Sequence, residues 1–191
     1  MKQLLILMLG IVTVCCKAQM SPQPKKMTEK YFSDPAIEIT TPTFLKKKGF
    51  TTYDELITFI NAQQSNHRNT VTISYIGESQ NGKQIPMIRL EKKNGVDNKI
   101  KVWLQGCLHG DEPASTEGML FLLDKILNDS EYSYLLDRLE IAIIPMANID
   151  GNAKLQRVSA NGIDLNRDQT KLMAPESRYL KKAFHYCPTK N

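Results

Sequence analysis

The sequence has little of what marks several classes of protein. It holds one tryptophan, and its 25 basic and 20 acidic residues leave a formal charge of only +5. A dedicated nucleic-acid-binding protein would show a denser basic stripe with interleaved aromatic residues. Glycine and proline together are too few for a collagen-like repeat or extensive disorder. Its long apolar run, residues 4–14, is about half the roughly 20 residues of a membrane-spanning helix. The composition therefore predicts a globular domain without a nucleic-acid partner or a transmembrane span.

The first 18 residues have the pattern of an export signal. A lysine at position 2 precedes the apolar run, and Cys16 and Ala18 place small side chains at the −3 and −1 positions of a cleavage site. The sequence thus predicts a signal peptide over residues 1–18 and a periplasmic or secreted location. A lipid anchor on Cys15 or Cys16 is the alternative, although the residues before each cysteine suit such processing poorly.

Cys107 and Cys187 are the two cysteines outside this segment. An oxidising compartment would permit them to form a disulfide if their geometry allowed it. The alternative is a small buried hydrophobic residue at Cys107 and a thiol near the end of the chain at Cys187. The sequence leaves both readings open.

Residues 19–50 contain four prolines and two lysine clusters, which indicates a linker or an irregular lead-in before a domain over residues 51–191. The Asn81-Gly82 pair predicts a tight turn between two strands. The expected strands cover residues 71–76, 85–90, 100–108 and 139–146, and the expected helices cover 51–61, 113–128, 132–137 and 175–184. Strands that alternate with helices indicate an α/β fold with a mixed, mostly parallel central sheet flanked by helices.

The sharpest local pattern is the run His109-Gly110-Asp111-Glu112, between the expected strand 100–108 and the next helix. The carboxyl end of a strand is where open α/β sheets bind ligands. An imidazole and a carboxylate three residues apart can converge on Zn²⁺, which in catalytic sites takes about three protein ligands and one open position. Alone, such a pair is also consistent with a loop histidine beside a helix-capping acid.

Other landmarks stand in a fixed order around this run. They are Tyr53-Asp54-Glu55-Leu56, Ile76-Gly77-Glu78-Ser79 with Gly82-Lys83, Asn148 with Asp150-Gly151, and Asp164-Leu165-Asn166-Arg167. Together with the residues from His109 to Ala114, they resemble the zinc carboxypeptidase family, the carboxypeptidase A-like metallopeptidases, over residues 50–185. The run at His109 and the short path from Asn148 to Arg167 are more similar to the bacterial murein-peptide amidase branch than to the digestive enzymes.

The resemblance implies a zinc-dependent hydrolase that cleaves an amide bond near a free carboxylate of a peptide or cell-wall peptide. It implies that His109 and Glu112 are zinc ligands and that Asn166 and Arg167 bind the substrate carboxylate. A guanidinium fork suits this task because it holds a carboxylate with two parallel charge-assisted hydrogen bonds. Arg157 would polarise the scissile carbonyl and stabilise the oxyanion.

By the same resemblance, the second zinc histidine and the glutamate base lie beyond Asn191. Residues 51–191 are therefore expected to be the amino-terminal part of the fold and inactive alone, because neither His67 in a polar loop nor His185 at a helix end suits the missing ligand. Two alternatives stay open. One is a non-catalytic module that binds peptide carboxylates, and the other is an N-acyl amino-acid deacylase.

Overall fold

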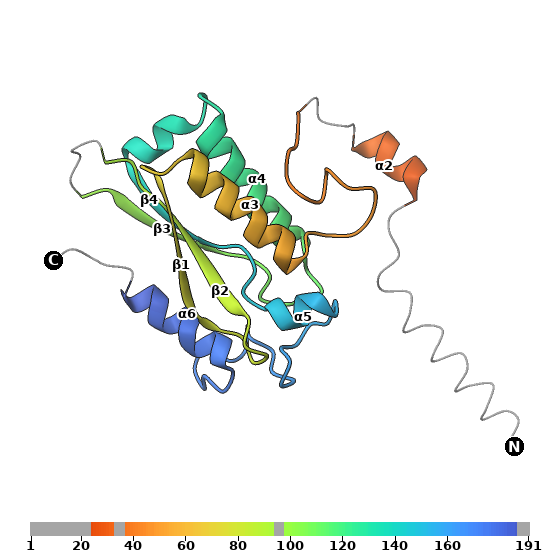
Figure 1. Ribbon diagram of the computed structural model, residues 1–191. Helices are drawn as coiled ribbons and strands as arrows, with labels where there is room; N and C mark the ends of the chain where they lie inside the picture. The colour runs from red at the N-terminus through yellow and green to blue at the C-terminus, as the bar shows by residue number, and fades with distance from the viewer. Residues whose placement is uncertain (1–23, 33–36, 94–97, 187–191) are drawn as a thin grey trace, which may run out of the picture. The chain divides into compact units, whose positions relative to one another are not determined.

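The computed structural model describes residues 24–32, 37–93 and 98–186 (Figure 1). The chain divides into two units, Met1–Glu38 and Ile39–Asn191. The first contains one described helix, α2 (Lys25–Tyr31), inside the segment expected to be a linker or irregular. Residues 39–50 belong to the second unit, where they form turns and bends. The expected signal peptide, residues 1–18, lies outside the described residues.

A four-stranded sheet with the order β1-β2-β4-β3 is the centre of the second unit (Figure 1). The strands are β1 (Val71–Glu78), β2 (Gln84–Leu90), β3 (Ile100–Gln105) and β4 (Leu139–Ile144). β2 is antiparallel to β1, with Val71 opposite Leu90, and also antiparallel to β4. β3 is parallel to β4, with Ile100 opposite Leu139. The mixed sheet is confirmed.

Parallel pairing does not dominate among the described strands, and in this respect the expectation was wrong. Two of the three strand pairs are antiparallel. The predicted Asn81-Gly82 turn, with Gly82 at φ +80°, joins β1 and β2 as a hairpin, and strands joined by so short a turn must run antiparallel. The crossover from β3 to β4 is long enough to contain a helix, and it produces the one parallel pair.

All helices of the second unit except α5 lie close to the expected positions. The helices of this unit are α3 (Tyr53–Asn66), α4 (Ala114–Asn128), a 3₁₀ helix (Ser133–Asp137), α5 (Ile149–Ala153) and α6 (Pro175–Tyr186). α3 begins at a capping box, in which the Thr52 side chain accepts from the Glu55 N–H and the Glu55 carboxylate accepts from the Thr52 N–H. The helix expected over residues 51–61 thus forms, although it begins at Tyr53 and continues to Asn66. α5 was not expected.

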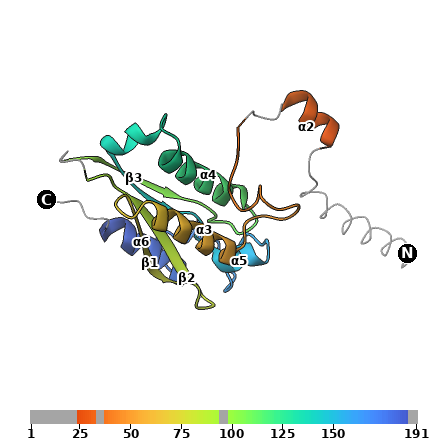
Figure 2. The ribbon, with the colours of Figure 1, turned by 45° about the horizontal axis from the view of Figure 1, so that its top comes forward.

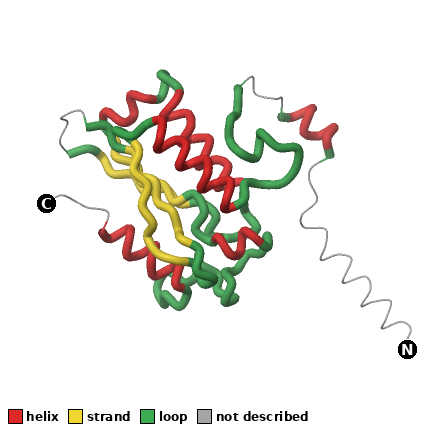
Figure 3. The backbone as a smooth tube through the Cα atoms, viewed as in Figure 1, coloured by secondary structure: helices red, strands yellow, loops and turns green. Residues whose placement is uncertain are grey.

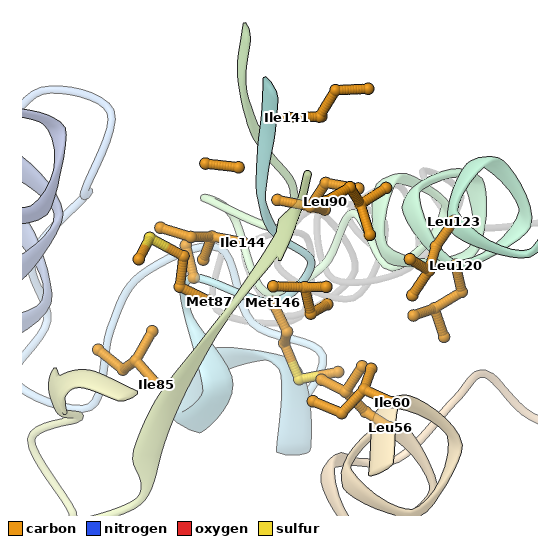
Figure 4. Packing of buried hydrophobic residues seen from close by; sticks show 14 of the residues in the cluster. Leu56, Ile60, Ile85, Met87, Leu90, Leu120, Leu123, Ile141, Ile144 and Met146 are labelled. Atoms are coloured by element: carbon orange, nitrogen blue, oxygen red, sulfur yellow. The ribbon is translucent and has the colours of Figure 1, made fainter. Parts of the chain in front are cut away.

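The core lies on both faces of the sheet. α3 and α4 cover one face, and α6 covers the other (Figures 1 and 2). In Figure 4, Leu120 and Leu123 of α4, with Leu56 and Ile60 of α3, gather on one side of the strands, and Ile85 and Met87 of β2 lie on the other. The central strands β2 and β4 are buried along most of their length. Among the described residues, every helix is too short or too polar to cross a membrane.

The Asp168 carboxylate secures the turn that leads into α6. This buried group accepts a hydrogen bond from the Met173 N–H at 2.9 Å and another from the Ala174 N–H at 2.8 Å. Burial alone would raise the pKa of Asp168, but the two backbone hydrogen bonds outweigh it and hold that pKa below its ordinary value. The carboxylate is thus a structural acceptor in its ionised form.

We expect Asp168→Ala to lower the free energy of unfolding at pH 7 by about 2–3 kcal/mol, because two backbone N–H groups, one of them buried, lose a charged acceptor. Since the pKa of Asp168 is lowered by folding, its contribution is complete above about pH 4 and is lost as the pH falls through the folded-state pKa. Urea unfolding at pH 7 and below pH 4 measures both effects. Asp129→Ala, at the half-buried end of α4, is the matched control, and an equal loss in both variants would contradict the prediction.

Candidate metal centre

The turns that follow β3 and β4 lie side by side at the carboxyl ends of these two parallel strands. Backbone hydrogen bonds continue the pairing past the strand ends, from the Gly106 N–H to the Ile144 carbonyl at 2.8 Å and from the Asn148 N–H to the Cys107 carbonyl at 2.8 Å. Loops gather at this end of the sheet (Figure 3). The run at His109 is on the first turn, and α5 follows the second.

Gly110 brings these two turns into direct backbone contact. A Cβ atom at Gly110 would lie 2.1 Å from the Gly151 carbonyl carbon, 2.3 Å from the Asn152 nitrogen and 2.6 Å from the Gln156 oxygen. All three are backbone atoms, so no side-chain rotation could relieve the overlap. Glycine at this position therefore allows the segment after α5 to pack against the turn that carries His109 and Glu112.

The two predicted zinc ligands face one another. His109 is 7% exposed, and its Nδ1 atom lies 3.1 Å from Glu112 Oε1. Its other ring nitrogen, Nε2, lies 3.1 Å from Asp164 Oδ1. One nitrogen of the imidazole is thus held by a carboxylate from a distant loop, while the other points to the predicted partner ligand.

Asp164 joins the remaining predicted residues to this pair. Arg157 Nε lies 3.1 Å and Arg167 Nε 3.3 Å from Asp164 Oδ2, and the Asn166 N–H donates to Asp164 Oδ1 at 3.0 Å. Partial burial would raise the pKa of Asp164, but the His109 hydrogen bond and the Arg157 charge outweigh it and hold that pKa below its ordinary value. The carboxylate is therefore ionised at neutral pH and balances the two guanidinium groups.

Asp164 is the residue at the centre of this cluster that the sequence did not indicate. It stands in the string Asp164-Leu165-Asn166-Arg167, of which only the asparagine and the arginine received a role. A signal did exist, because a metal-ligating histidine almost always donates its second ring N–H to a carboxylate, a backbone carbonyl or water. The sequence spacing of 55 residues gave no indication that this carboxylate would be Asp164.

The groups that would meet a ligand are open to solvent. The side chains of Glu112 and Arg167 are 59% and 81% exposed, and the Arg157 Nη1 atom lies 3.8 Å from Glu112 Oε1. Asn166 is also exposed, and only its backbone N–H contacts Asp164. His109 and the two arginines are thus held by Asp164, while parts of the arginine side chains and the Glu112 carboxylate stay accessible to a ligand.

His109 and Glu112 offer the nitrogen and oxygen donors that zinc takes in proteins. Within residues 24–32, 37–93 and 98–186, no three His, Cys, Asp or Glu side chains form a metal-binding group. His67 Nε2 instead contacts Asn128 Oδ1 at 3.0 Å, and His185 packs edge-on to Phe184. The donors present therefore fit two ligands of a zinc site, with the second ring nitrogen of His109 already held as such a ligand requires.

Cys107, two residues before His109, is buried and forms no disulfide within the described residues. Burial raises the pKa of Cys107 to about 11, so the thiol stays protonated at neutral pH and is a poor nucleophile. The Asn152 amide donates to its sulfur at 3.4 Å. Its expected alternative partner, Cys187, lies outside the described residues.

Comparison with known proteins gives the same family at the level of sequence. Residues 56–187 match the family model described as zinc carboxypeptidase. The probable carboxypeptidase 2 of Arthroderma benhamiae is 38% identical over 113 residues, which are 56% of this chain and 22% of that protein. Carboxypeptidase SOL1 of Arabidopsis thaliana is 28% identical over 138 residues, which are 70% of this chain and 28% of that protein. The chain thus spans 22–28% of the length of these relatives.

Solved structures agree at the level of the fold. Carboxypeptidase A from Helicoverpa armigera superposes with a TM-score of 0.64 at 23% identity, over 70% of this chain and 42% of that one. A metallo-carboxypeptidase from Burkholderia cenocepacia superposes with a TM-score of 0.61 at 22% identity, over 72% of this chain and 39% of that one. Because the family model covers well over half of the residues, the resemblance is confirmed, and the chain belongs to the zinc carboxypeptidase family.

Proposed function

We propose that this chain carries two zinc ligands and the carboxylate-binding arginine of a metallocarboxypeptidase, which hydrolyses an amide bond next to a free carboxylate. The observation that carries the proposal is the meeting of His109, Arg157 and Arg167 at the Asp164 carboxylate, with Glu112 beside the histidine. His109 and Glu112 would hold the metal. When bound, zinc polarises a carbonyl and lowers the pKa of a bound water.

Asp164 would position His109 for this role. A carboxylate that accepts the Nε2 proton selects one tautomer of the imidazole and leaves the Nδ1 lone pair free. Nδ1 is the nitrogen that faces Glu112. The contact between His109 and Asp164 therefore prepares the histidine to act as a ligand, with a fixed ring orientation.

The two arginines would divide the negative charges of the substrate between them. Arg167 contacts Asp164 through Nε and exposes most of its side chain, so its terminal nitrogens can hold the free carboxylate of a peptide. The exposed Asn166 amide would add a further donor. Of the two arginines, Arg157 is the one that contacts both Asp164 and the predicted ligand Glu112. It would therefore stabilise the negative charge that develops on the scissile carbonyl oxygen.

We expect Arg167→Ala to reduce kcat/KM for a peptide with a free terminal carboxylate by about 30-fold or more, mainly through KM. Loss of a charge-assisted pair costs about 2 kcal/mol, which corresponds to that factor. The assay uses the protein that contains this chain, with matched peptides that end in a carboxylate or an amide. The amidated peptide should already be a poor substrate, and Arg167→Ala should change its hydrolysis little.

Arg138→Ala is the matched control, because Arg138 precedes β4 at the opposite end of the sheet. Equal hydrolysis of both peptides would contradict the carboxypeptidase proposal. A preference for cell-wall peptides would support the amidase branch, and a preference for N-acyl amino acids would support the deacylase. Carboxylate binding without hydrolysis would support the non-catalytic module.

The expected incompleteness of the chain stays a prediction with a simple test. Translation of the nucleotide sequence beyond the Asn191 codon, in all three frames, should reveal a strand that ends in histidine and, later, a glutamate. Unrelated sequence in all frames would favour the non-catalytic module. Zinc-dependent peptide cleavage by residues 19–191 alone would contradict the expectation that this part is inactive.

A further inference from the structure

The loop of residues 41–50, which precedes α3, exposes three large apolar side chains. Phe44, Leu45 and Phe50 are 58%, 75% and 47% exposed. Lys47 and Lys48 stand between them in the sequence, and both are exposed. Apolar side chains that cluster on a surface mark a contact site more often than single exposed residues do.

This loop is held in a defined shape by its own hydrogen bonds. Lys46 Nζ donates to the Phe50 carbonyl at 2.7 Å and to Glu55 Oε2 at 2.6 Å. At the end of the loop, the Thr51 N–H and hydroxyl donate to the Glu117 carboxylate of α4 at 2.8 and 2.7 Å. The apolar side chains are therefore presented by an anchored turn, with Lys47 and Lys48 left for an external partner.

A cavity of about 540 Å³ adjoins the loop. Its lining comes from three segments: residues 48–54, Lys83 of the β1–β2 turn, and Ile149, Asn152, Ala153 and Leu155 in and after α5. Lys83 Nζ lies 4.9 Å from the centre of the Tyr53 ring. Asp54 also lines the cavity, but among the described residues neither Lys48 nor Lys83 forms an ion pair with it or with any other acid.

The cavity is separate from the candidate metal centre. None of His109, Glu112, Arg157, Asp164 and Arg167 lines it. Its chemistry also differs, because it combines apolar walls with the ammonium groups of Lys48 and Lys83, which form no ion pair in the part of the chain that the structure describes. This combination suits a ligand with an apolar body and a negatively charged head.

We propose that the loop of residues 41–50 and the adjoining cavity bind the surface of an anionic lipid bilayer. Phe44, Leu45 and Phe50 enter the boundary between headgroups and acyl chains, as apolar side chains of interfacial segments do. Lys47 and Lys48 contact the anionic headgroups, which attract lysines close to the bilayer surface. The cavity accepts part of one acyl chain, with Lys83 near its headgroup.

The test is sedimentation of the 191-residue chain with vesicles of phosphatidylcholine, with and without 30% phosphatidylserine. We expect stronger binding to the anionic vesicles. The double variants Phe44→Ser/Leu45→Ser and Lys47→Glu/Lys48→Glu should each reduce that binding at least about tenfold. Tyr134→Ser, at an exposed aromatic residue on the 3₁₀ helix, is the matched control and should leave it unchanged. All of these proteins share the apolar run at residues 4–14, so their differences report on the substituted sites.

Each other outcome overturns the proposal. Equal binding by the wild type and the loop variants would exclude the loop, and equal binding to both kinds of vesicle would exclude the role of the lysines. Sensitivity to the lysine variant alone would indicate a purely electrostatic partner, such as an acidic protein. In a Phe50→Trp variant, lipids brominated on their acyl chains should quench the fluorescence of the new tryptophan. Absence of this quenching would exclude insertion.

Discussion

Gly110→Ala is expected to lower the free energy of unfolding by about 3 kcal/mol or more, at the upper end of what added core volume costs. The added Cβ would lie 2.1–2.6 Å from backbone atoms of Gly151, Asn152 and Gln156. Relief requires that the segment after α5 move away from the turn that carries His109. Chemical unfolding monitored by circular dichroism measures the loss of stability.

Gly118→Ala is the matched control, because the same substitution in the interior of α4 would meet no atom within 4 Å. There we expect a gain of about 0.5–1 kcal/mol, since alanine favours the helix over glycine. A Gly110→Ala variant as stable as wild type would show that the two turns do not pack as described. The position of α5 beside the candidate metal centre would then be wrong as well.

His109→Ala is expected to weaken zinc binding by more than about 100-fold. Loss of a residue that only orients a metal ligand costs about 10–100-fold in affinity, and His109 is a proposed ligand itself. His109 supplies one of the two donors in the cluster and also joins it to Asp164. Titration of zinc into the 191-residue chain, in competition with a chromogenic chelator, measures the effect. Asp164→Asn keeps the ligands but weakens the orientation of the imidazole, so we expect a loss within that 10–100-fold range.

Two further variants keep this test decisive. His67→Ala removes a histidine whose described contact is Asn128, and it should leave zinc affinity unchanged. Glu112→Gln alters an exposed side chain, so it should fold like the wild type and still lose affinity. Zinc binding that survives both His109→Ala and Glu112→Gln would contradict the proposed ligands.

The local elements could be predicted because their signals are short-range. The Asn81-Gly82 turn and the apolar runs of β2 and β4 each depend on a few neighbouring residues. α5 was not predicted because it has only five residues and contains Gly151, a poor helix former. The Asn148 side chain caps this helix by accepting a hydrogen bond from the Gly151 N–H at 3.0 Å. A single asparagine before so short a segment was too weak a signal to predict a helix.

The candidate site divides in the same way. His109 and Glu112 are three residues apart on one turn, so their approach followed from local sequence. The union of Arg157 and Arg167 at Asp164, and of Asp164 with His109, depends on a loop that returns to the end of the sheet after β4 and α5. No local pattern encodes that return.

The sequence by itself determined the strands and the longer helices of the second unit, the family and four of the five groups that gather at the candidate metal centre. Only the tertiary structure decided that Asp164 links them, that β2 runs antiparallel to β4, and that Phe44, Leu45 and Phe50 stay exposed beside a cavity. The reason is physical. Caps, turns and periodicity act over a few residues, whereas burial and ion pairing depend on which distant segments the folded chain brings into contact.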